Sequence, residues 1–232
     1  MTRLGLVTGL VVEAARIEAV FDSVPESERP FVGVAGGSAE RAASVAMQHL
    51  ENGADVLVSF GIAGGLDPSR SPGDIVVGTF VWQDADLTQT DTAPAWTQLL
   101  AERIGLECRV ETGGVAGIDT PVMSSAGKAL LRDKTDAVAA DMESHGVARV
   151  AAKAGIPLLV IRAIADPATR AIPAAALVGM GPDGHRRPFA VLGKLLTRPQ
   201  DLPGIIGLAR DSSAALGSLA VAARILLKTR FS

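Results

Sequence analysis

The chain has 232 residues, of which 48% are hydrophobic and 3% aromatic, and its formal net charge is −3. This length suffices for one domain with a large core. The slightly acidic balance indicates no nucleic-acid partner. The single cysteine, Cys108, cannot form an internal disulfide, which fits a reducing cytoplasm.

The first segment, "MTRLGLVTGLVVEAARI", superficially resembles a secretory signal because Arg3 precedes an apolar run. Glu13 and Arg16 interrupt that run early and no small-residue cleavage pattern follows, so we interpret the segment as a first strand. No stretch of about 18 uncharged apolar residues occurs, so no transmembrane helix is expected.

Short apolar runs alternate with helical patterns over the first 166 residues. The predicted strands are Leu4–Thr8, Phe31–Ala35, Val56–Phe60, Asp74–Val81, Arg109–Val115, Ala137–Ala139 and Leu158–Ala165. The predicted helices are Val12–Val20, Ala39–Asn52, Pro94–Ile104, Ser124–Thr135 and Asp141–Ala154. This alternation predicts a single three-layer α/β/α domain over residues 1–232, with a central mixed sheet.

Two glycine-rich turns are predicted beside these strands. "SFGIAGGLDP", Ser59–Pro68, follows a strand, and "GVAGGSAERAA", Gly33–Ala43, opens a helix. Glycines let backbone amides approach a ligand closely, and a helix start favours an anion or hydroxyl. Neither segment has GxGxxG spacing and no Walker motif occurs, which disfavours dinucleotides and triphosphates. Tight turns without any ligand explain either segment alone about equally well.

Two carboxylates are the main candidates for a functional site. Glu143 is predicted on the packed face of its helix, away from the polar stripe formed by Asp141, His145, Arg149 and Lys153. Asp166 follows the apolar run "PLLVIRAIA", so it lies where a buried strand leaves the sheet and where α/β sheets bind ligands. The pair predicts a site for a polar small molecule. The structural alternatives are an ion pair of Glu143 with Arg162 and an ordinary Asp-Pro turn.

The C-terminal part differs in composition. Residues 167–188 contain four prolines and three glycines, and we interpret them as a loop or lid over the site. Residues 189–232 are predicted to form two helices, separated near Pro199 and Pro203. We expect apolar side chains of these helices to line a groove or to face a membrane, namely Leu195, Leu196, Ile205 and Ile206. Apolar side chains at helical spacing more commonly belong to a core or a dimer interface.

Taken in order, the motifs resemble the purine nucleoside phosphorylase family that includes the methylthioadenosine/S-adenosylhomocysteine nucleosidases. "SFGIAGGLDPSRSPGDIVV" resembles the family's glycine-rich segment and Gly-Asp-Ile-Val strand, "AADMESHGVARVA" its Met-Glu helix, and "VIRAIAD" its Arg-Ala-Ile-Ser-Asp strand end. The resemblance runs from Leu4 to about Asp166. The C-terminal third is similar to the hopanoid-associated branch, which acts on adenosylhopane.

The resemblance implies cleavage of the N-glycosidic bond of a purine nucleoside, with no cofactor and no metal. Asp166 matches the acid that protonates purine N7, Glu13 the glutamate that activates water, and Glu143 the glutamate that binds the ribose hydroxyls. We assign further substrate-binding positions on the same segments: Met142, Gly61, Ala63, Gly64, Gly36 and Ser59.

Departures from the family pattern bear on the nucleophile. Ala165 and Ile62 stand where relatives have serine. Ser59 and Glu13 stand at or near positions where bacterial phosphorylases place phosphate-binding arginines, and a carboxylate repels phosphate. Water is therefore the favoured nucleophile. A different phosphate site, and with it phosphorolysis, stays open through Arg16, Ser38 and Arg41.

The resemblance also implies a small-molecule nucleoside substrate and a cytoplasmic homo-oligomer, expected to be a dimer. Three basic residues near the C-terminus are candidates for contact with anionic lipid at the inner membrane face, although basic residues also cap helices: Arg224, Lys228 and Arg230. The non-enzymatic alternative is a nucleoside-binding protein, which would not need to retain the acid and the base.

Overall fold

The computed structural model describes residues 2–21, 24–83, 88–173, 185 and 197–231. Its eight strands are β1 (Leu4–Thr8), β2 (Phe31–Val34), β3 (Val56–Gly65), β4 (Ile75–Gln83), β5 (Thr88–Asp91), β6 (Val110–Gly117), β7 (Ala137–Asp141) and β8 (Leu158–Asp166). Its α-helices are α1 (Val11–Glu18), α2 (Ala39–Glu51), α3 (Pro94–Gly105), α4 (Ser125–Thr135), α5 (Ser144–Ala154) and α7 (Leu202–Lys228). Two short 3-10 helices are Glu26–Glu28 and Pro199–Asp201.

All eight strands belong to one mixed sheet, as the sequence predicts. The order is β2-β1-β3-β7-β6-β4-β5, and β8 pairs with both β3 and β4. Strands β2, β1, β3 and β8 run parallel to one another, whereas β7 is antiparallel to β3. The carboxyl ends of these four parallel strands therefore lie at the same edge of the sheet, where ligands bind in α/β folds.

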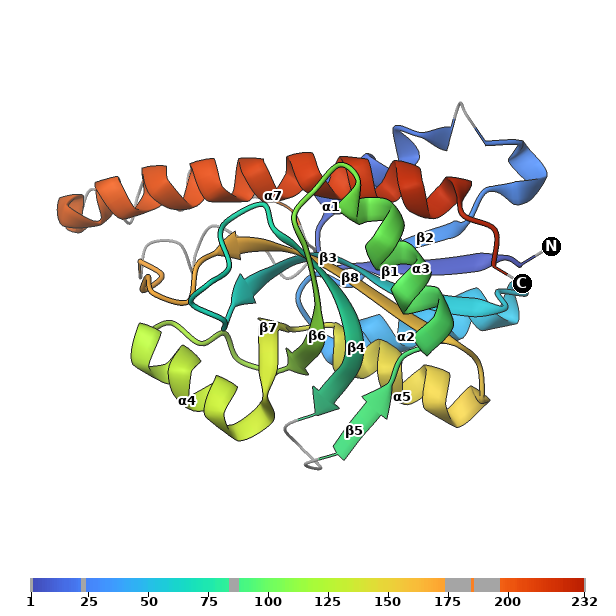
Figure 1. Ribbon diagram of the computed structural model, residues 1–232, viewed down its shortest axis with the longest axis horizontal. Coiled ribbons are helices and arrows are strands. Elements are labelled where there is room, and N and C mark those ends of the chain that lie inside the picture. Colours follow the sequence, from blue (N-terminus) through green and yellow to red (C-terminus); the bar gives the residue numbers. More distant parts are fainter. Residues whose placement is uncertain (1, 22–23, 84–87, 174–184, 186–196, 232) are drawn as a thin grey trace.

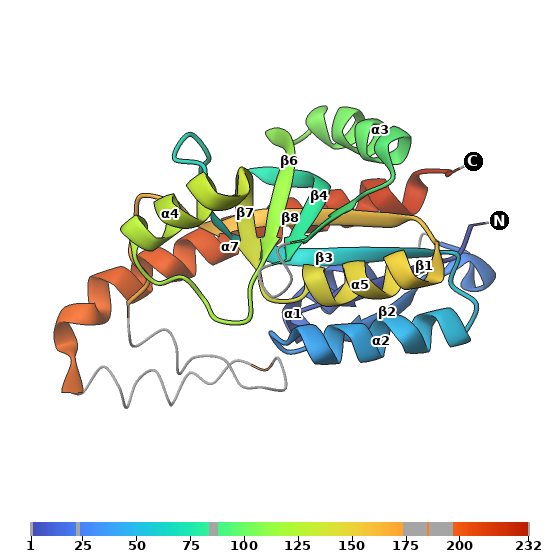
Figure 2. The same ribbon diagram turned by 90° about the horizontal axis from the view of Figure 1, so that it is seen from below.

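Helices cover both faces of the sheet, which gives the predicted three layers. Helix α7 runs along one face, and α2 and α5 lie side by side on the opposite face (Figures 1 and 2). On the first face, Leu219 and Leu226 of α7 are fully buried against the strands. On the second, small side chains such as Ala46 and Val147 fill the space beneath α2 and α5. Each buried leucine contributes about 1.5–3 kcal/mol.

The glycine-rich segment Ser59–Pro68 is not the turn that was predicted, because β3 continues as far as Gly65. The glycines are needed for space within the strand. A Cβ at Gly61 would lie 2.6 Å from Nη1 of Arg162 and 2.8 Å from Oε2 of Glu13. The second predicted glycine turn is present: Gly36 and Gly37 have φ values of 65° and 68°, and α2 begins just after them.

The helix predicted over Asp141–Ala154 begins three residues later, at Ser144, because Asp141 is the last residue of β7. Oδ1 of Asp141 accepts hydrogen bonds from the backbone N–H groups of Glu143 (3.1 Å) and Ser144 (2.8 Å), which holds the start of the helix. Glu143 therefore precedes the helix and does not lie on its packed face. His145, predicted on a polar stripe, is buried.

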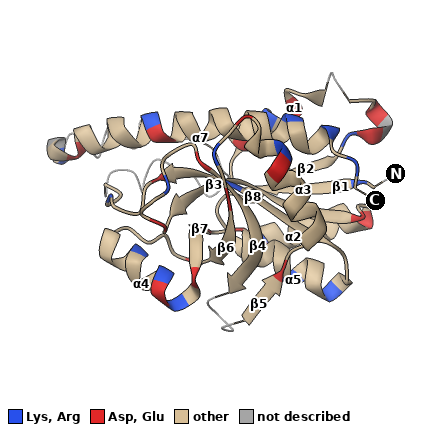
Figure 3. Cartoon of the chain, in the orientation of Figure 1, with Lys and Arg blue, Asp and Glu red and all other residues tan. Residues whose placement is uncertain are grey.

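Helix α7 corresponds to the second predicted C-terminal helix. The first predicted helix, most of the predicted lid, Leu195 and Leu196 lie outside the described residues. By length and composition α7 could cross a membrane, a property that we predicted for no segment, but core helices of soluble proteins share it. Only four of its residues are charged, and its first half extends beyond the sheet (Figures 1 and 3).

Candidate active site

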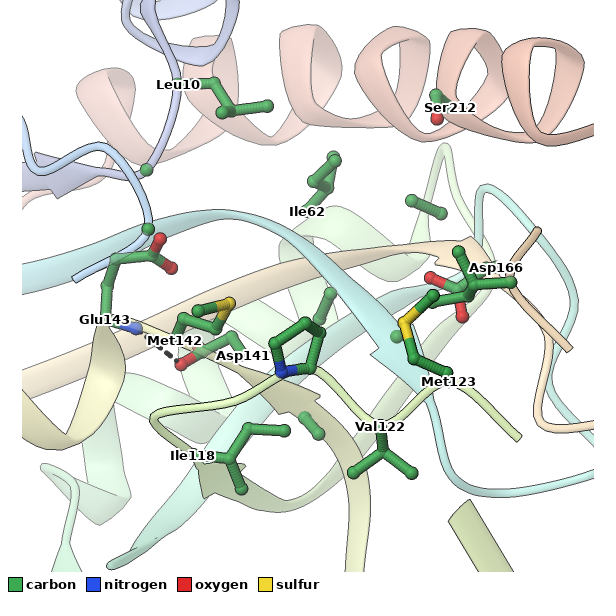
Figure 4. Close-up of a pocket in the computed structure, with 18 of the residues that line it drawn as sticks. Leu10, Ile62, Ile118, Val122, Met123, Asp141, Met142, Glu143, Asp166 and Ser212 are labelled. Atoms are coloured by element: carbon green, nitrogen blue, oxygen red, sulfur yellow. Dashed lines mark hydrogen bonds between the residues drawn. The ribbon is translucent and has the colours of Figure 1, made fainter. Parts of the chain in front are cut away.

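A cavity of about 490 Å³ opens at the edge of the sheet where the parallel strands end. Its walls are mainly apolar, with acidic side chains at separate places. Asp166 and Glu143 lie on opposite sides of the cavity, with Met142 beside Glu143 (Figure 4). The arrangement suits a ligand with an apolar body and polar groups at two ends.

Glu13 lies in the first turn of α1 and is 1% exposed. Its Oε2 accepts hydrogen bonds from the N–H groups of Gly9 and Leu10, and its Oε1 accepts one from Ile62, all at 2.8 Å. A carboxylate offers about four acceptor positions, so one remains for a ligand in the cavity. Burial raises the pKa of Glu13, while the three N–H donors and the Arg162 guanidinium oppose that rise.

Arg162 of β8 is fully buried beneath the cavity and holds several side chains in place. Its Nε lies 2.6 Å from Oδ2 of Asp141, and its Nη1 lies 3.6 Å from Oε2 of Glu143. Its Nη2 donates to the hydroxyls of Ser59 (2.6 Å) and Ser144 (3.1 Å). The ion pair between Arg162 and Glu143, which we considered as a structural alternative for Glu143, is thus present, but its N–O distance is long.

Glu143 is the least stabilised carboxyl of this group. Its carboxyl is only 6% exposed, and its partners among the described residues are the Arg162 guanidinium at 3.6 Å and the backbone N–H of Met142. Burial raises its pKa to about 8; Arg162 opposes the rise, and the charges of Asp141 and Glu13 add to it. One guanidinium faces three carboxylates here, which favours the protonated form of Glu143.

The substitution Glu143→Gln is expected to stabilise the protein at alkaline pH. A glutamate of the unfolded chain ionises near 4.5, whereas Glu143 in the folded protein ionises at about 8. The wild type therefore loses stability between these two pH values, at up to about 1.4 kcal/mol per pH unit, and the neutral glutamine does not. Thermal unfolding from pH 5 to pH 9 should show the difference in Tm growing in favour of the variant. A difference independent of pH would mean that the pKa of Glu143 in the folded protein is not raised.

Asp166 is the last residue of β8, and its Oδ2 forms a buried ion pair with Nζ of Lys128 from α4. Lys128 also donates to the carbonyls of Pro167 (2.9 Å) and Arg170 (3.3 Å). Burial raises the pKa of Asp166, and the Lys128 ammonium opposes that rise. Gly64 of β3 makes room for the carboxyl, since a Cβ there would lie 3.3 Å from Oδ2.

The cavity brings together most of the predicted substrate-binding residues. Those that line it are Met142, Glu143, Ala63, Gly64 and Gly36, together with the predicted catalytic residues Asp166 and Glu13. Two predictions of direct contact need correction, because Ser59 and Gly61 do not line the cavity. Ser59 is fully buried and bonds to Arg162, and Gly61 leaves space for the Arg162 and Glu13 side chains.

The residues proposed for an alternative phosphate site are not gathered into one. Arg41 lines the cavity, but its Nε and Nη2 donate to the carbonyls of Ala35 and Gly36, both at 2.6 Å. Ser38 caps α2 by accepting the N–H of Arg41, and Arg16 is exposed and does not line the cavity. Among the described residues, no group of three His, Cys, Asp or Glu side chains could hold a metal ion.

Two important residues received no functional role from the sequence. Lys128 lies 38 positions before Asp166, and no spacing rule links a helix residue to a strand end so far away. Asp141 had a usable signal. An aspartate shortly before a helix, followed by Glu143 and Ser144, is typical of a side chain that caps the helix start.

Helix α7 forms one side of the cavity. Leu208 and Ser212 line it, together with Ile172 from the chain after β8 and Leu10 from the loop after β1. Figure 4 shows Ser212 and Leu10 on the side of α7. The predicted groove residues of α7 do not contribute: neither Ile205 nor Ile206 lines the cavity.

Residues 15–180 match the family described as the Phosphorylase superfamily. A 5′-methylthioadenosine/S-adenosylhomocysteine nucleosidase from Neisseria meningitidis, solved with methylthio-immucillin-A, superposes with a TM-score of 0.75 at 19% identity, over 99% of this chain and 100% of that one. Futalosine hydrolase of Helicobacter pylori superposes with a TM-score of 0.70 at 17% identity, over 95% and 97%. At these identities the similarity shows a common fold.

Proposed function

The chain belongs to the phosphorylase superfamily, and from this premise we propose that it cleaves the N-glycosidic bond of a 5′-substituted adenosine and releases adenine. The observation that carries the proposal is the cavity itself. Asp166, a buried acid, lies on one side of the cavity and Glu143 on the other, and Glu13 is close enough to Glu143 for its charge to act on that carboxyl. A purine nucleoside needs this separation, because its base and its ribose hydroxyls lie at opposite ends of the glycosidic bond.

The proposed reaction assigns one proton transfer to each side. Departure of adenine places negative charge on the purine and positive charge on the ribose ring. Asp166 in its protonated form gives its proton to N7 of the leaving base, and the burial that raises its pKa favours that form. Glu13 accepts a proton from water through its remaining acceptor position, and the water oxygen bonds to C1′.

Glu143 is proposed to bind the ribose hydroxyls. Its buried carboxyl has few partners in the described part of the chain, the Arg162 guanidinium at 3.6 Å and the Met142 N–H, so two hydroxyls of a bound ribose would provide further donors. Donors to the ionised form lower a pKa, so substrate binding would favour loss of the proton from Glu143. Met142, which lines the cavity beside it, supplies an apolar surface for the sugar.

Water is the proposed nucleophile. Glu13 lines the cavity, and its ionised carboxylate would repel a phosphate bound beside it, because two charges of the same sign repel. Arg41 is an arginine that lines the cavity and could contact a phosphate, but its Nε and Nη2 already donate to backbone carbonyls.

The test is product analysis with and without inorganic phosphate. Methylthioadenosine, longer 5′-alkyl adenosines and adenosylhopane are each incubated with the protein, and adenine is measured by chromatography. We expect adenine and a free 5′-substituted ribose, formed at a rate that does not change with phosphate. A ribose 1-phosphate product would contradict the choice of water, and substrate binding without any adenine would indicate a nucleoside-binding protein.

The finer proposal is that the 5′ group is large and apolar, as in adenosylhopane. Leu10, Ile172 and Leu208 give the cavity an apolar side along α7. Leu202 and Ile206 of the same helix are 48% and 55% exposed, so the apolar surface continues outside the cavity. This exposed apolar surface would let a cytoplasmic enzyme take up a lipid-like substrate from the inner membrane face. Alternatively, it would pack against the second subunit of a dimer.

In the same assay, kcat/KM should rise with the length of the apolar 5′ group. Each methylene that is buried contributes about 0.8 kcal/mol, or up to about fourfold in kcat/KM. A preference for methylthioadenosine with falling kcat/KM for longer groups would instead support a methylthioadenosine/S-adenosylhomocysteine nucleosidase.

A further inference from the structure

Lys128 is a buried lysine beside the proposed general acid. Its side chain is 2% exposed and it lies in the second turn of α4, in the wall of the cavity. Burying an ammonium costs several kcal/mol unless it is paired and hydrogen-bonded. Such a lysine is not required to fill space, because an apolar side chain of similar length would do so without that cost.

The hydrogen bonds of Lys128 are fully used by the protein. An ammonium has three N–H groups. In the structure they point to Oδ2 of Asp166 and to the carbonyls of Pro167 and Arg170. No N–H is left to reach a purine, so Lys128 can act on the reaction only through Asp166.

The second carboxyl oxygen of Asp166, Oδ1, is available to bind a ligand. Within the described ranges, Oδ1 of Asp166 accepts no hydrogen bond, whereas Oδ2 is paired with Lys128. The pairing thus fixes the rotation of the carboxyl group and leaves one oxygen for a ligand in the cavity.

Three charged side chains surround Asp166. Lys128 approaches from α4, Arg170 from the chain after β8, and Asp211 from α7. Arg170 and Asp211 are also paired with each other, so their opposite charges largely offset at Asp166. Among the charges around the carboxyl, the Lys128 ammonium therefore has the largest effect, and it opposes the rise in pKa that burial causes.

We propose that Lys128 is a positioning residue for the acid step: it holds Oδ2 of Asp166, directs Oδ1 toward N7 of the leaving purine, and stabilises the carboxylate that remains after proton transfer. The proposal rests on the proposed function. In the step, the proton on Asp166 moves to N7 as the C1′–N9 bond breaks, and the charge left on Asp166 is paired with Lys128.

The first test does not depend on catalysis. Asp166 is titrated by carbon NMR in protein labelled at the aspartate carboxyls, with Asp166→Asn identifying the signal. In Lys128→Met the Asp166 pKa should be higher than in wild type by about 1 to 3 pH units, because the opposing charge is gone. Lys128→Arg should stay near the wild-type value. An unchanged Asp166 pKa in Lys128→Met would overturn the proposal.

The second test compares two leaving groups. Adenine needs protonation to leave, whereas 4-nitrophenolate does not. Lys128→Met should lower kcat for adenine release about tenfold, part of the roughly 10²–10⁴ that an acid contributes, and move the alkaline limb of the pH profile upward. Cleavage of 4-nitrophenyl riboside should change less than about twofold. Equal losses on both substrates would mean that Lys128 has only a structural role.

Two further variants keep the result interpretable. Lys128→Gln removes the charge but keeps a hydrogen-bond donor, and replaces Lys128→Met if that variant unfolds. Lys134→Met removes an exposed lysine of the same helix that stacks over Trp82, and should behave as wild type in both tests. If wild type releases no adenine, the proposed function fails, and the NMR titration still decides whether Lys128 controls Asp166.

Discussion

Asp166→Asn is expected to lower adenine release by about 10²–10⁴-fold, the usual contribution of a general acid. The amide keeps the shape of the carboxyl, and its oxygen can still accept the hydrogen bond of Lys128. It cannot give a proton to purine N7. Affinity for an uncleavable nucleoside analogue should therefore change by less than about threefold, while kcat collapses.

The matched control is Asp133→Asn, which makes the same change at an exposed position of α4. It should leave kcat and KM as in wild type. Turnover of Asp166→Asn within a few-fold of wild type on a purine nucleoside would remove Asp166 from the mechanism.

Glu13→Gln is expected to have the second large effect, a fall in kcat of about 10²–10⁴-fold through loss of the base that activates water. The structure adds a second consequence. Oε1 of Glu13 accepts the N–H of Ile62, and Oε2 accepts those of Gly9 and Leu10. A glutamine must place its NH₂ group against one set of donors, which leaves a buried N–H unpaired and costs about 1–3 kcal/mol.

The two consequences can be separated because they depend differently on temperature. Activity is measured well below the Tm of the variant, where nearly all molecules are folded, with Glu18→Gln on the exposed side of α1 as the control. A deep loss of kcat in fully folded protein supports the base. If activity falls only in proportion to the unfolded fraction, Glu13 serves to hold the loop after β1 against β3.

Much of the fold could be predicted from local patterns. Seven strands and six helices were predicted near their observed positions. The strands were predictable because runs such as Val56–Phe60 and Leu158–Ala165 are almost entirely apolar, as in strands buried on both faces. Strand β5 was missed because its residues, Thr88–Asp91, are polar and mostly exposed, and only pairing with β4 makes them a strand. Asp166 could be placed at a sheet edge because it directly follows a buried strand.

The tertiary structure alone decided how the site is assembled. Sequence spacing describes neighbours along the chain, whereas the site is formed by contacts between distant segments. The glycines of β3 were predicted to form a turn because the local sequence does not show what they make room for. The side chains that fill the space beside Gly61 are those of Arg162 and Glu13, which belong to distant segments of the chain. In the same way, Lys128 meets Asp166 across 38 residues, a pairing that only the packing of α4 against the sheet could determine.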